Sequence, residues 1–281
     1  MHPPPRAHRQ AATPPEPLAW ADGRVVPVAE ATVPLTDDGF LRGDAVFEAM
    51  LVRDGRTHAR ELHLARMSRS AGAVQLPLPE AEVARAIDDL LRAWGAHDGS
   101  IKVIATRGGL VRGLIGGVHW PETVGLQVIE LPWRTALSGV KTLSYAANQW
   151  ALRQARMAGA DDALLVDDHL VHELPTGAVV LVHDGNCSTP DPDRLPILSS
   201  VSVEVLRRIV DVAPTTPDLA ELARADEVFI VSATRPCLPV HAVQLSDGKR
   251  LELTAPGPVT AALQVRLEEH LLATLDPAPA D

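Results

Sequence analysis

Lys141 is the residue of this sequence whose chemistry most needs an explanation. Of the 26 Lys and Arg residues in the chain, only Lys102, Lys141 and Lys249 are lysines. Lysine, unlike arginine, can lose its proton and attack a carbonyl group as a free amine. Lys102 lies on the expected exposed face of a strand and Lys249 in a turn, so surface charge explains both. Lys141 precedes an expected helix, where it is either a solvated cation or a nucleophile.

Glu173 and Arg66 are the charged residues that would complete such chemistry. Glu173 follows an expected strand in "DDHLVHELPTG". It is either an exposed loop acid or a carboxylate that accepts a hydrogen bond from a protonated heterocyclic nitrogen. Arg66 in "HLARM" lies either on the polar face of its helix or in a phosphate-binding site, which guanidinium groups suit. Taken one at a time, each of these residues has an ordinary structural explanation.

The elements that must position these residues form two groups. In the first half, a short strand with an extended connection precedes a hairpin turned at Asp54 and Gly55, and two helices and two strands follow. Their expected ranges are 23–35, 43–59, 61–74, 79–96, 100–109 and 124–131. In the second half, helical and strand patterns are mixed, with expected ranges 148–160, 162–168, 178–185, 200–213, 219–232 and 258–275. This order predicts an α/β fold built from two α/β units.

The same pass along the chain predicts its domain boundaries. Residues 1–17 are rich in proline and are expected to form a disordered arm. A small N-terminal domain is expected over 18–132 and a larger C-terminal domain over 140–276, joined by a linker at 133–139 and followed by a tail at 277–281. The candidate lysine therefore lies at the start of the second domain.

Composition and charge narrow the classes of function. The chain has 281 residues, of which 46% are hydrophobic and 22% charged, as in ordinary globular proteins. Its net charge of −10 makes a nucleic-acid backbone an unfavourable partner. Cys187 and Cys237 lie far apart in sequence, so neither a disulfide scaffold nor a metal site is expected. The sequence has no apolar run of membrane-spanning length and no secretory signal pattern, so a cytoplasmic protein is expected.

Taken together and in order, the motifs resemble one known family. The N-terminal half contains "LTDDGFLRGDAVFEAMLVRDG" and "HLARMSRSAGAVQLPLP", and the C-terminal half contains "VKTLSYAANQWALRQARMAGADDALLVD", "LVHELPTGAVVLVHDG" and "DEVFIVSATRPCLPV". Glu173 follows Lys141 by 32 positions. From Ala21 to Val243 the chain resembles the fold-type IV pyridoxal-phosphate (PLP) enzymes of the class-IV aminotransferase superfamily. That superfamily contains branched-chain aminotransferases, D-amino-acid transaminases and 4-amino-4-deoxychorismate lyases.

The resemblance implies a role for each candidate residue. Lys141 would form the Schiff base with PLP and then carry protons during the reaction. Glu173 would keep the pyridine nitrogen protonated, which makes the ring an electron sink. Arg66 would bind the phosphate. Tyr145 would lie near the phenolic oxygen of the cofactor.

The resemblance also implies a phosphate cup, in which this sequence departs from the family pattern. Backbone N–H groups of Leu198 and Ser199, near the start of a helix, would bind the phosphate. Ile197 stands where the family has glycine, which permits close backbone approach or a positive φ. Ser200 stands where the family has arginine.

A second departure concerns the hydroxyl group that would bind the phosphate from the opposite segment. That position is Ala233, and Ser232 or Thr234 would have to replace its hydroxyl. These departures favour an alternative: a repurposed family member that binds a small amine or aromatic acid without catalysis or without PLP. The retention of Lys141, Glu173 and Arg66 together opposes that alternative.

Among the reactions of the family, the motifs look most like the 4-amino-4-deoxychorismate lyase branch. Such an enzyme eliminates pyruvate and forms 4-aminobenzoate. Arg107, in "TRGG", would contact a substrate carboxylate, with a purely structural role as its alternative. The alternative reaction is transamination of branched-chain or D-amino acids. In either case the resemblance implies a homodimer, a small amino-acid-like substrate, a barrel-like sheet in the larger domain and a cofactor site between the two domains.

Overall fold

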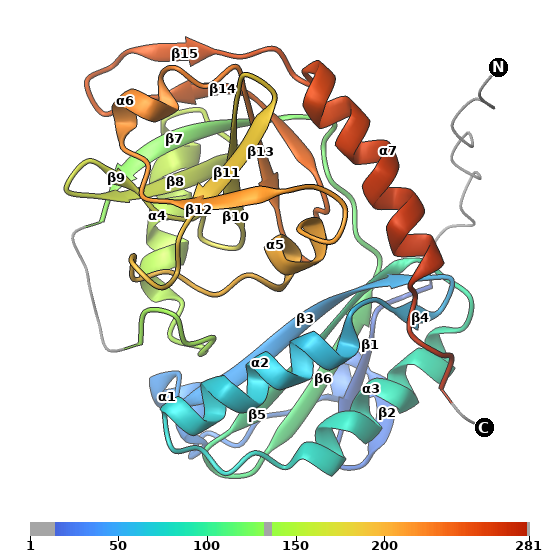
Figure 1. The fold of residues 1–281 in the computed structure, drawn as a ribbon. Coiled ribbons are helices and arrows are strands. Elements are labelled where there is room, and N and C mark those ends of the chain that lie inside the picture. Colours follow the sequence, from blue (N-terminus) through green and yellow to red (C-terminus); the bar gives the residue numbers. More distant parts are fainter. Residues whose placement is uncertain (1–14, 132–136, 280–281) are drawn as a thin grey trace, which may run out of the picture. The chain divides into compact units, whose positions relative to one another are not determined.

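The structure is a computed structural model that describes residues 15–131 and 137–279. Within it, the chain forms two compact units (Figure 1). The N-terminal unit comprises Met1–His119 with Leu271–Asp281, and the C-terminal unit comprises Trp120–His270. These units differ in their bounds from the predicted domains of 18–132 and 140–276, and the predicted domain boundaries stay a prediction. Most of the predicted linker, including residues 133–136, lies outside the described residues.

The N-terminal unit is built on a six-stranded sheet in the order β2-β1-β6-β5-β3-β4. Its strands are β1 (Leu18–Ala21), β2 (Arg24–Pro27), β3 (Ala45–Arg53), β4 (Arg56–Thr57), β5 (Gly99–Thr106) and β6 (Val111–Gly116). All neighbouring strands pair antiparallel. The β3–β4 hairpin turns at Asp54 and Gly55, as predicted.

Helices α2 (Arg60–Ala73) and α3 (Glu80–Trp94) cover this sheet, and α1 (Asp38–Arg42) is a short turn that precedes β3 (Figure 1). In α3 the apolar residues recur at helical spacing, acids fill the first turn, and Gly95 ends the helix with a positive φ. Its buried face packs on β1, β5 and β6 around Trp20 and Trp94. The core of this unit is therefore closed by one amphipathic helix and by the more polar α2.

The C-terminal unit contains a nine-stranded mixed sheet in the order β12-β11-β10-β13-β14-β7-β8-β9, with β15 paired to β14. Its strands are β7 (Val124–Glu130), β8 (Asp162–Asp167), β9 (Leu170–Val171), β10 (Ala178–His183), β11 (Asn186–Pro190), β12 (Val212–Thr215), β13 (Glu227–Val231), β14 (Leu238–Gln244) and β15 (Arg250–Glu252). The pairs β7–β8, β7–β14 and β11–β12 are parallel. Both strands that flank the Glu173 loop, β9 and β10, belong to this sheet.

Four helices accompany this sheet: α4 (Ala146–Met157), α5 (Val201–Leu206), α6 (Leu219–Leu222) and α7 (Pro258–Ala273). Helix α4 packs on β7 and β8 through Ala151 and Ala155. The carboxylate of Glu227, which is buried, accepts the backbone N–H groups of Val259 and Thr260 and so caps the first turn of α7.

Two predictions about these elements were wrong. The helix predicted over 200–213 ends at Leu206, and Val212–Thr215 instead forms β12 beside β11. Val201, Val203 and Val205 lie within the helix that forms, whereas parallel pairing with β11 takes up Val212–Thr215 at the end of the segment. The strand β6 was not predicted, because Gly113 weakens its strand pattern. A Cβ at Gly113 would lie 2.6 Å from a methyl carbon of Leu90, so the missing side chain lets α3 pack closely.

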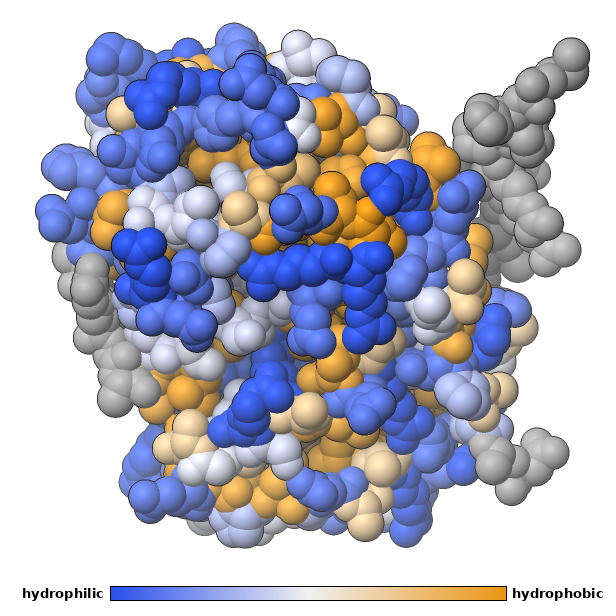
Figure 2. All heavy atoms as spheres, viewed as in Figure 1, coloured by the Kyte–Doolittle hydropathy of each residue, from blue (hydrophilic) through white to orange (hydrophobic). Residues whose placement is uncertain are grey.

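On the face drawn in Figure 2, polar residues cover much of each unit, with apolar residues interspersed among them. Among the described residues, no helix is both long enough and apolar enough to cross a membrane. The α/β architecture predicted from the sequence is confirmed.

Candidate active site

Lys141 and Tyr145 lie together at the entrance to α4. Gly139 has a φ of +84°, and this turn brings the chain to Lys141. Tyr145 is the residue that immediately precedes α4, and its carbonyl accepts the N–H of Gln149. In the non-helical segment before α4, Lys141 Nζ lies 3.3 Å from the phenolic oxygen of Tyr145 and donates to it. Both side chains are partly buried. A primary amine and a phenol are therefore within hydrogen-bonding distance of each other.

Glu173 lies in the loop between β9 and β10. Its backbone carbonyl accepts the N–H of Leu165 on β8, which fixes the loop to the sheet. Its side-chain Oε2 accepts the backbone N–H of Leu198 at 3.2 Å. A hydrogen bond from an amide favours the charged form of a carboxylate. The predicted phosphate donor Leu198 thus contacts the predicted partner of the pyridine nitrogen, and a bond from this N–H to phosphate would require that contact to break.

Asn148 connects the lysine segment to the Glu173 loop. It lies in the first turn of α4, and its side-chain Nδ2 donates to the carbonyl of Pro175 at 3.1 Å. This contact was not predicted from the sequence. The one signal for it is that Asn148 follows Tyr145 by about one helical turn. Through Asn148, the segments that carry Lys141 and Glu173 are held side by side.

Arg235 forms a second connection that sequence reasoning missed. Its Nη2 donates to the hydroxyl of Thr176 at 2.7 Å, and its Nη1 donates to the carboxylate of Asp162 at 2.7 Å. Its Nε donates to the hydroxyl of Ser232 at 3.3 Å. The signal in the sequence was an arginine directly after the candidate hydroxyl residues in "SATR". Arg235 therefore links the Glu173 loop to the Ser232–Thr234 segment.

The departures from the family pattern have simple structural outcomes. Ile197 has no positive φ, and its side chain is buried, so the chain at this position does not need glycine. Ser200 accepts the N–H of Val203 and caps α5. Ser199 is exposed. The segment at 197–200 is thus well formed with its own residues, although its role toward a phosphate stays a prediction.

In the N-terminal unit, Arg66 is part of a buried cluster on α2 and β3. Its Nε and Nη2 donate to the two carboxylate oxygens of Glu48 at 2.7 and 2.8 Å. His63 Nδ1 lies 2.8 Å from Glu48 Oε2. All three residues are buried, and Glu48 is fully so. Arg66 therefore does not lie on an exposed polar face, which was its alternative explanation.

Two strong effects on the pKa of Glu48 act in opposite directions. Burial alone would raise the pKa, but hydrogen bonds and positive charge from Arg66, with a further contribution from His63, lower it to about 2. Glu48 is thus ionised across the physiological range. The signal that sequence reasoning missed is a single acid within the apolar strand "AVFEAMLV".

Arg107, the predicted contact for a substrate carboxylate, lies just after β5. Its guanidinium pairs with Asp44 and donates to the carbonyls of Val74 and Gln75 at the end of α2. The hydrogen bond to Asp44 raises the pKa of Arg107. These contacts give Arg107 a structural role, and its contact with substrate stays a prediction.

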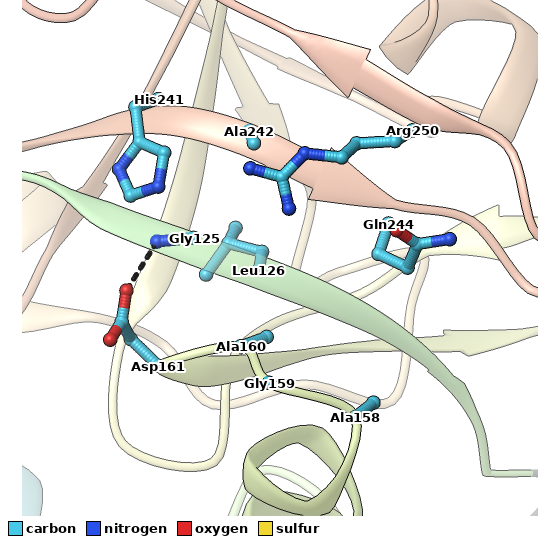
Figure 3. A pocket seen from close by; sticks show the side chains of 10 residues that line it. All are labelled: Gly125, Leu126, Ala158, Gly159, Ala160, Asp161, His241, Ala242, Gln244 and Arg250. Atoms are coloured by element: carbon cyan, nitrogen blue, oxygen red, sulfur yellow. Dashed lines mark hydrogen bonds between the residues drawn. The ribbon is translucent and has the colours of Figure 1, made fainter.

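A small cavity lies elsewhere in the C-terminal unit, at the edge where β7 and β14 meet the end of α4 (Figure 3). Asp161 accepts the N–H of Gly125 there, and the side chains of His241 and Arg250 line the same space. A Cβ at Gly125 would lie 3.2 Å from His241 Nε2, so the glycine keeps this space open. None of the predicted site residues line it.

The side chains of the C-terminal unit suit PLP. The cofactor presents an aldehyde, a pyridine nitrogen and a phosphate. The described residues of this unit offer the Lys141 amine, the carboxylate of Glu173 and hydroxyl groups at Tyr145, Ser232 and Thr234. Among the described residues, no cluster of His, Cys, Asp and Glu could hold a metal ion.

Comparison with characterised proteins gives relatives over most of the chain. The bifunctional aminodeoxychorismate lyase / D-amino acid transaminase of Mycobacterium tuberculosis is 29% identical, over 86% of this chain and 95% of that protein. The D-alanine aminotransferase of Bacillus licheniformis is 28% identical, over 89% of this chain and 96% of that protein. The similarity is therefore not confined to single motifs.

The same holds for solved structures and for the family model. The PLP-bound form of a hypothetical aminotransferase from Mycobacterium tuberculosis superposes with a TM-score of 0.80 at 27% identity, covering 91% of this chain and 99% of that one. The model of the amino-transferase class IV family matches residues 45–243, a range that contains Arg66, Lys141 and Glu173. The chain belongs to the class IV aminotransferase family and is a PLP-dependent enzyme.

Proposed function

We propose that the protein is a PLP-dependent lyase that converts 4-amino-4-deoxychorismate to 4-aminobenzoate and pyruvate. The observation that carries the proposal is the Lys141 amine, 3.3 Å from the Tyr145 hydroxyl within the segment that matches the family. The bifunctional relative, whose name includes this lyase activity, supports the choice of reaction.

When bound, PLP supplies an electron sink that makes the proton on the substrate α-carbon removable. Lys141 Nζ takes that proton as a general base. Tyr145 holds the amine within reach, because Lys141 Nζ donates a hydrogen bond to its phenolic oxygen just before α4 begins. Glu173, whose Oε2 accepts the Leu198 N–H, would accept a hydrogen bond from the protonated heterocyclic nitrogen.

Arg66 is proposed to bind the phosphate group. Its Nε and Nη2 are directed at Glu48, so the carboxylate fixes the plane of the guanidinium. A guanidinium carries five N–H donors, which permits one face to bind a carboxylate while other donors bind phosphate. Fixing the side chain in advance lowers the entropic cost of binding.

Transamination of D-amino acids is the second candidate reaction. The names of the two relatives, a bifunctional lyase / D-amino acid transaminase and a D-alanine aminotransferase, favour it. It requires the same first proton transfer by Lys141 but returns the proton to the cofactor carbon instead of expelling pyruvate. Transamination of branched-chain amino acids uses the same steps with a different substrate pocket.

The test is to assay the purified protein with 4-amino-4-deoxychorismate and, separately, with D-alanine and 2-oxoglutarate. Release of pyruvate together with 4-aminobenzoate in the first assay is expected. Turnover in the second assay alone would replace the lyase with a transaminase. If neither assay gives turnover and the protein does not bind PLP, a repurposed member without the cofactor would be indicated instead.

Lys141→Ala is expected to reduce turnover by about a thousandfold or more, because the variant lacks both the covalent attachment point and the base. Lys102→Ala and Lys249→Ala are the matched controls, since both lysines are exposed. Borohydride reduction of the PLP-treated protein followed by peptide mapping should label Lys141. Label on Lys102 or Lys249, or an active Lys141→Ala variant, would contradict the assignment.

We also propose that the protein forms a homodimer. The described part of the N-terminal unit exposes a group of apolar side chains around α1, in which Leu35 is 77% exposed, Phe40 62% and Leu41 54%. Apolar groups of this size gain stability when another chain covers them. Sedimentation analysis of the wild-type chain checks the proposal, and a strictly monomeric protein would refute it. A cytoplasmic location remains a prediction from the sequence.

A further inference from the structure

Arg235 is a buried cation whose donors reach three separate segments of the C-terminal unit. Its side chain is 4% exposed. It pairs with Asp162 at the start of β8, donates to Thr176 in the Glu173 loop and donates to Ser232 after β13. The ring of Trp120 lies on its remaining face, 4.9 Å from the guanidinium carbon. A side chain with this many fixed contacts holds its neighbours in a single arrangement.

The segment that Arg235 holds most closely is the turn at residues 232–235. The backbone N–H of Ser232 donates to the carbonyl of Arg235 at 2.8 Å, and the N–H of Arg235 donates to the carbonyl of Ser232 at 3.1 Å. The Ser232 hydroxyl accepts the Arg235 N–H at 3.2 Å and its Nε–H at 3.3 Å. Both lone pairs of the hydroxyl are then used within the turn. The Ser232 hydroxyl therefore stabilises the turn.

Thr234 is the other hydroxyl residue in this turn. It lies between Ser232 and Arg235 in the chain and is partly buried. Among the described residues, its hydroxyl has no hydrogen-bond partner. The sequence left open whether Ser232 or Thr234 replaces the hydroxyl that Ala233 lacks. The Ser232 hydroxyl accepts two N–H groups of Arg235 but keeps its own O–H. The hydroxyls of Ser232 and Thr234 can therefore both donate to a phosphate oxygen.

We propose that Arg235 is a positioning residue for the phosphate of PLP, and that it acts by holding the turn that presents the hydroxyls of Ser232 and Thr234. The inference rests on the use of PLP but not on which reaction the enzyme catalyses. Arg235 is not itself assigned as a phosphate ligand, because Asp162 neutralises its charge and its donors are directed at Thr176 and Ser232. The close approach of Gly177 supports the arrangement, since a Cβ there would lie 3.3 Å from Arg235 Nη2 and 2.9 Å from the carbonyl of Val231.

The test is a double-mutant cycle read by ligand binding. The variants are Arg235→Lys, Thr234→Val and the double variant, with Arg224→Lys as the control because Arg224 is exposed in the same unit. The ligands are pyridoxamine 5′-phosphate and pyridoxamine. Neither has an aldehyde, so binding is non-covalent, and the two differ only in the phosphate.

Each single variant is expected to raise the Kd for pyridoxamine 5′-phosphate by about tenfold, the loss of one well-placed hydrogen bond. The Kd for pyridoxamine should change much less. The Kd of the double variant for pyridoxamine 5′-phosphate should be little higher than that of the single variant with the higher Kd, because both substitutions remove the same contact. Ser232→Ala keeps the guanidinium and removes the hydroxyl that accepts its N–H groups. This variant should also raise the Kd for pyridoxamine 5′-phosphate while changing the Kd for pyridoxamine much less.

Equal weakening for both ligands, or additive losses in the double variant, would overturn the inference, because Arg235 would then support only the fold. If Arg235→Lys does not fold, Thr176→Val gives the same decision, because it removes one acceptor of the guanidinium and leaves both hydroxyls of the turn in place. A protein that shows the expected cycle but releases no pyruvate from 4-amino-4-deoxychorismate would refute the proposed lyase function and leave this inference standing. A lyase whose cycle is additive would do the reverse.

Discussion

Arg66 and Arg235 are both buried arginines paired with a carboxylate, one in each unit, yet their surroundings differ. Arg66 gives two donors to a single residue, Glu48, which is fully buried and also contacts His63. Arg235 gives one donor to Asp162 and the rest to hydroxyl and carbonyl groups on two loops. The first arrangement concentrates the stabilisation in one ion pair, whereas the second distributes it over several weaker contacts. Removing the carboxylate partner should therefore cost most of the stabilisation around Arg66. Around Arg235, each single substitution should cost only part of it.

Glu48→Gln should give the largest loss of stability. The change leaves the charge of Arg66 buried without its partner, which typically costs about 3–5 kcal/mol. The free energy of unfolding, measured by denaturant titration, checks this. Glu30→Gln is the matched control, because Glu30 is exposed in the same unit. A loss below about 1 kcal/mol would mean that the cluster rearranges without Glu48 and that the contrast with Arg235 is unfounded.

The same cluster should set part of the acid sensitivity of the protein. Glu48 has a pKa of about 2 in the folded chain against 4.5 for an unperturbed glutamate, so its contribution to stability is complete above pH 4.5. That contribution, on the order of 3 kcal/mol, should be lost as the pH falls from 4.5 toward 2. The free-energy gap between wild type and Glu48→Gln should therefore shrink over that interval. If the difference in the free energy of unfolding stays constant with pH, the pKa of Glu48 is not lowered in the folded chain.

These clusters also show how far sequence reasoning reaches. The fold class followed from periodic patterns such as α3, and the candidate residues followed from motifs whose order alone is informative. The partners of those residues did not follow. Glu48 lies 18 positions before Arg66, and Asp162 lies 73 positions before Arg235. Nothing local in the sequence links such pairs, since only tertiary packing brings them into contact.

The sequence was also ambiguous where two residues of one type compete. The sequence does not rank Ser232 and Thr234 as hydroxyl donors, and the structure distinguishes them only by the two N–H groups that the Ser232 hydroxyl accepts. Likewise, Ile197 appeared incompatible with a glycine position, yet it is buried with a negative φ. A motif describes the residues that a family uses, whereas the backbone of a particular member determines which substitutions it accommodates.

Asp162→Asn should cost less stability than Glu48→Gln, and this tests the contrast directly. The guanidinium of Arg235 would keep its bonds to Thr176 and Ser232, and the amide oxygen of asparagine can still accept a hydrogen bond. A loss of about 1–3 kcal/mol is expected. The two variants should be compared by denaturant titration in one buffer. Equal losses for the two would show that both arginines depend on one charge partner.

Trp120→Leu should give the smallest effect, because it removes only the aromatic face from Arg235. The ring lies 4.9 Å from the guanidinium carbon and is itself 41% exposed. A cation–π contact of this kind contributes about 0.5–2 kcal/mol, and partial exposure places the expected loss near the lower end. Trp150→Leu is the control, since Trp150 is exposed in the same unit to a similar degree, at 45%. A loss as large as that of Asp162→Asn would mean that the aromatic ring, rather than the set of hydrogen bonds, holds Arg235 in place.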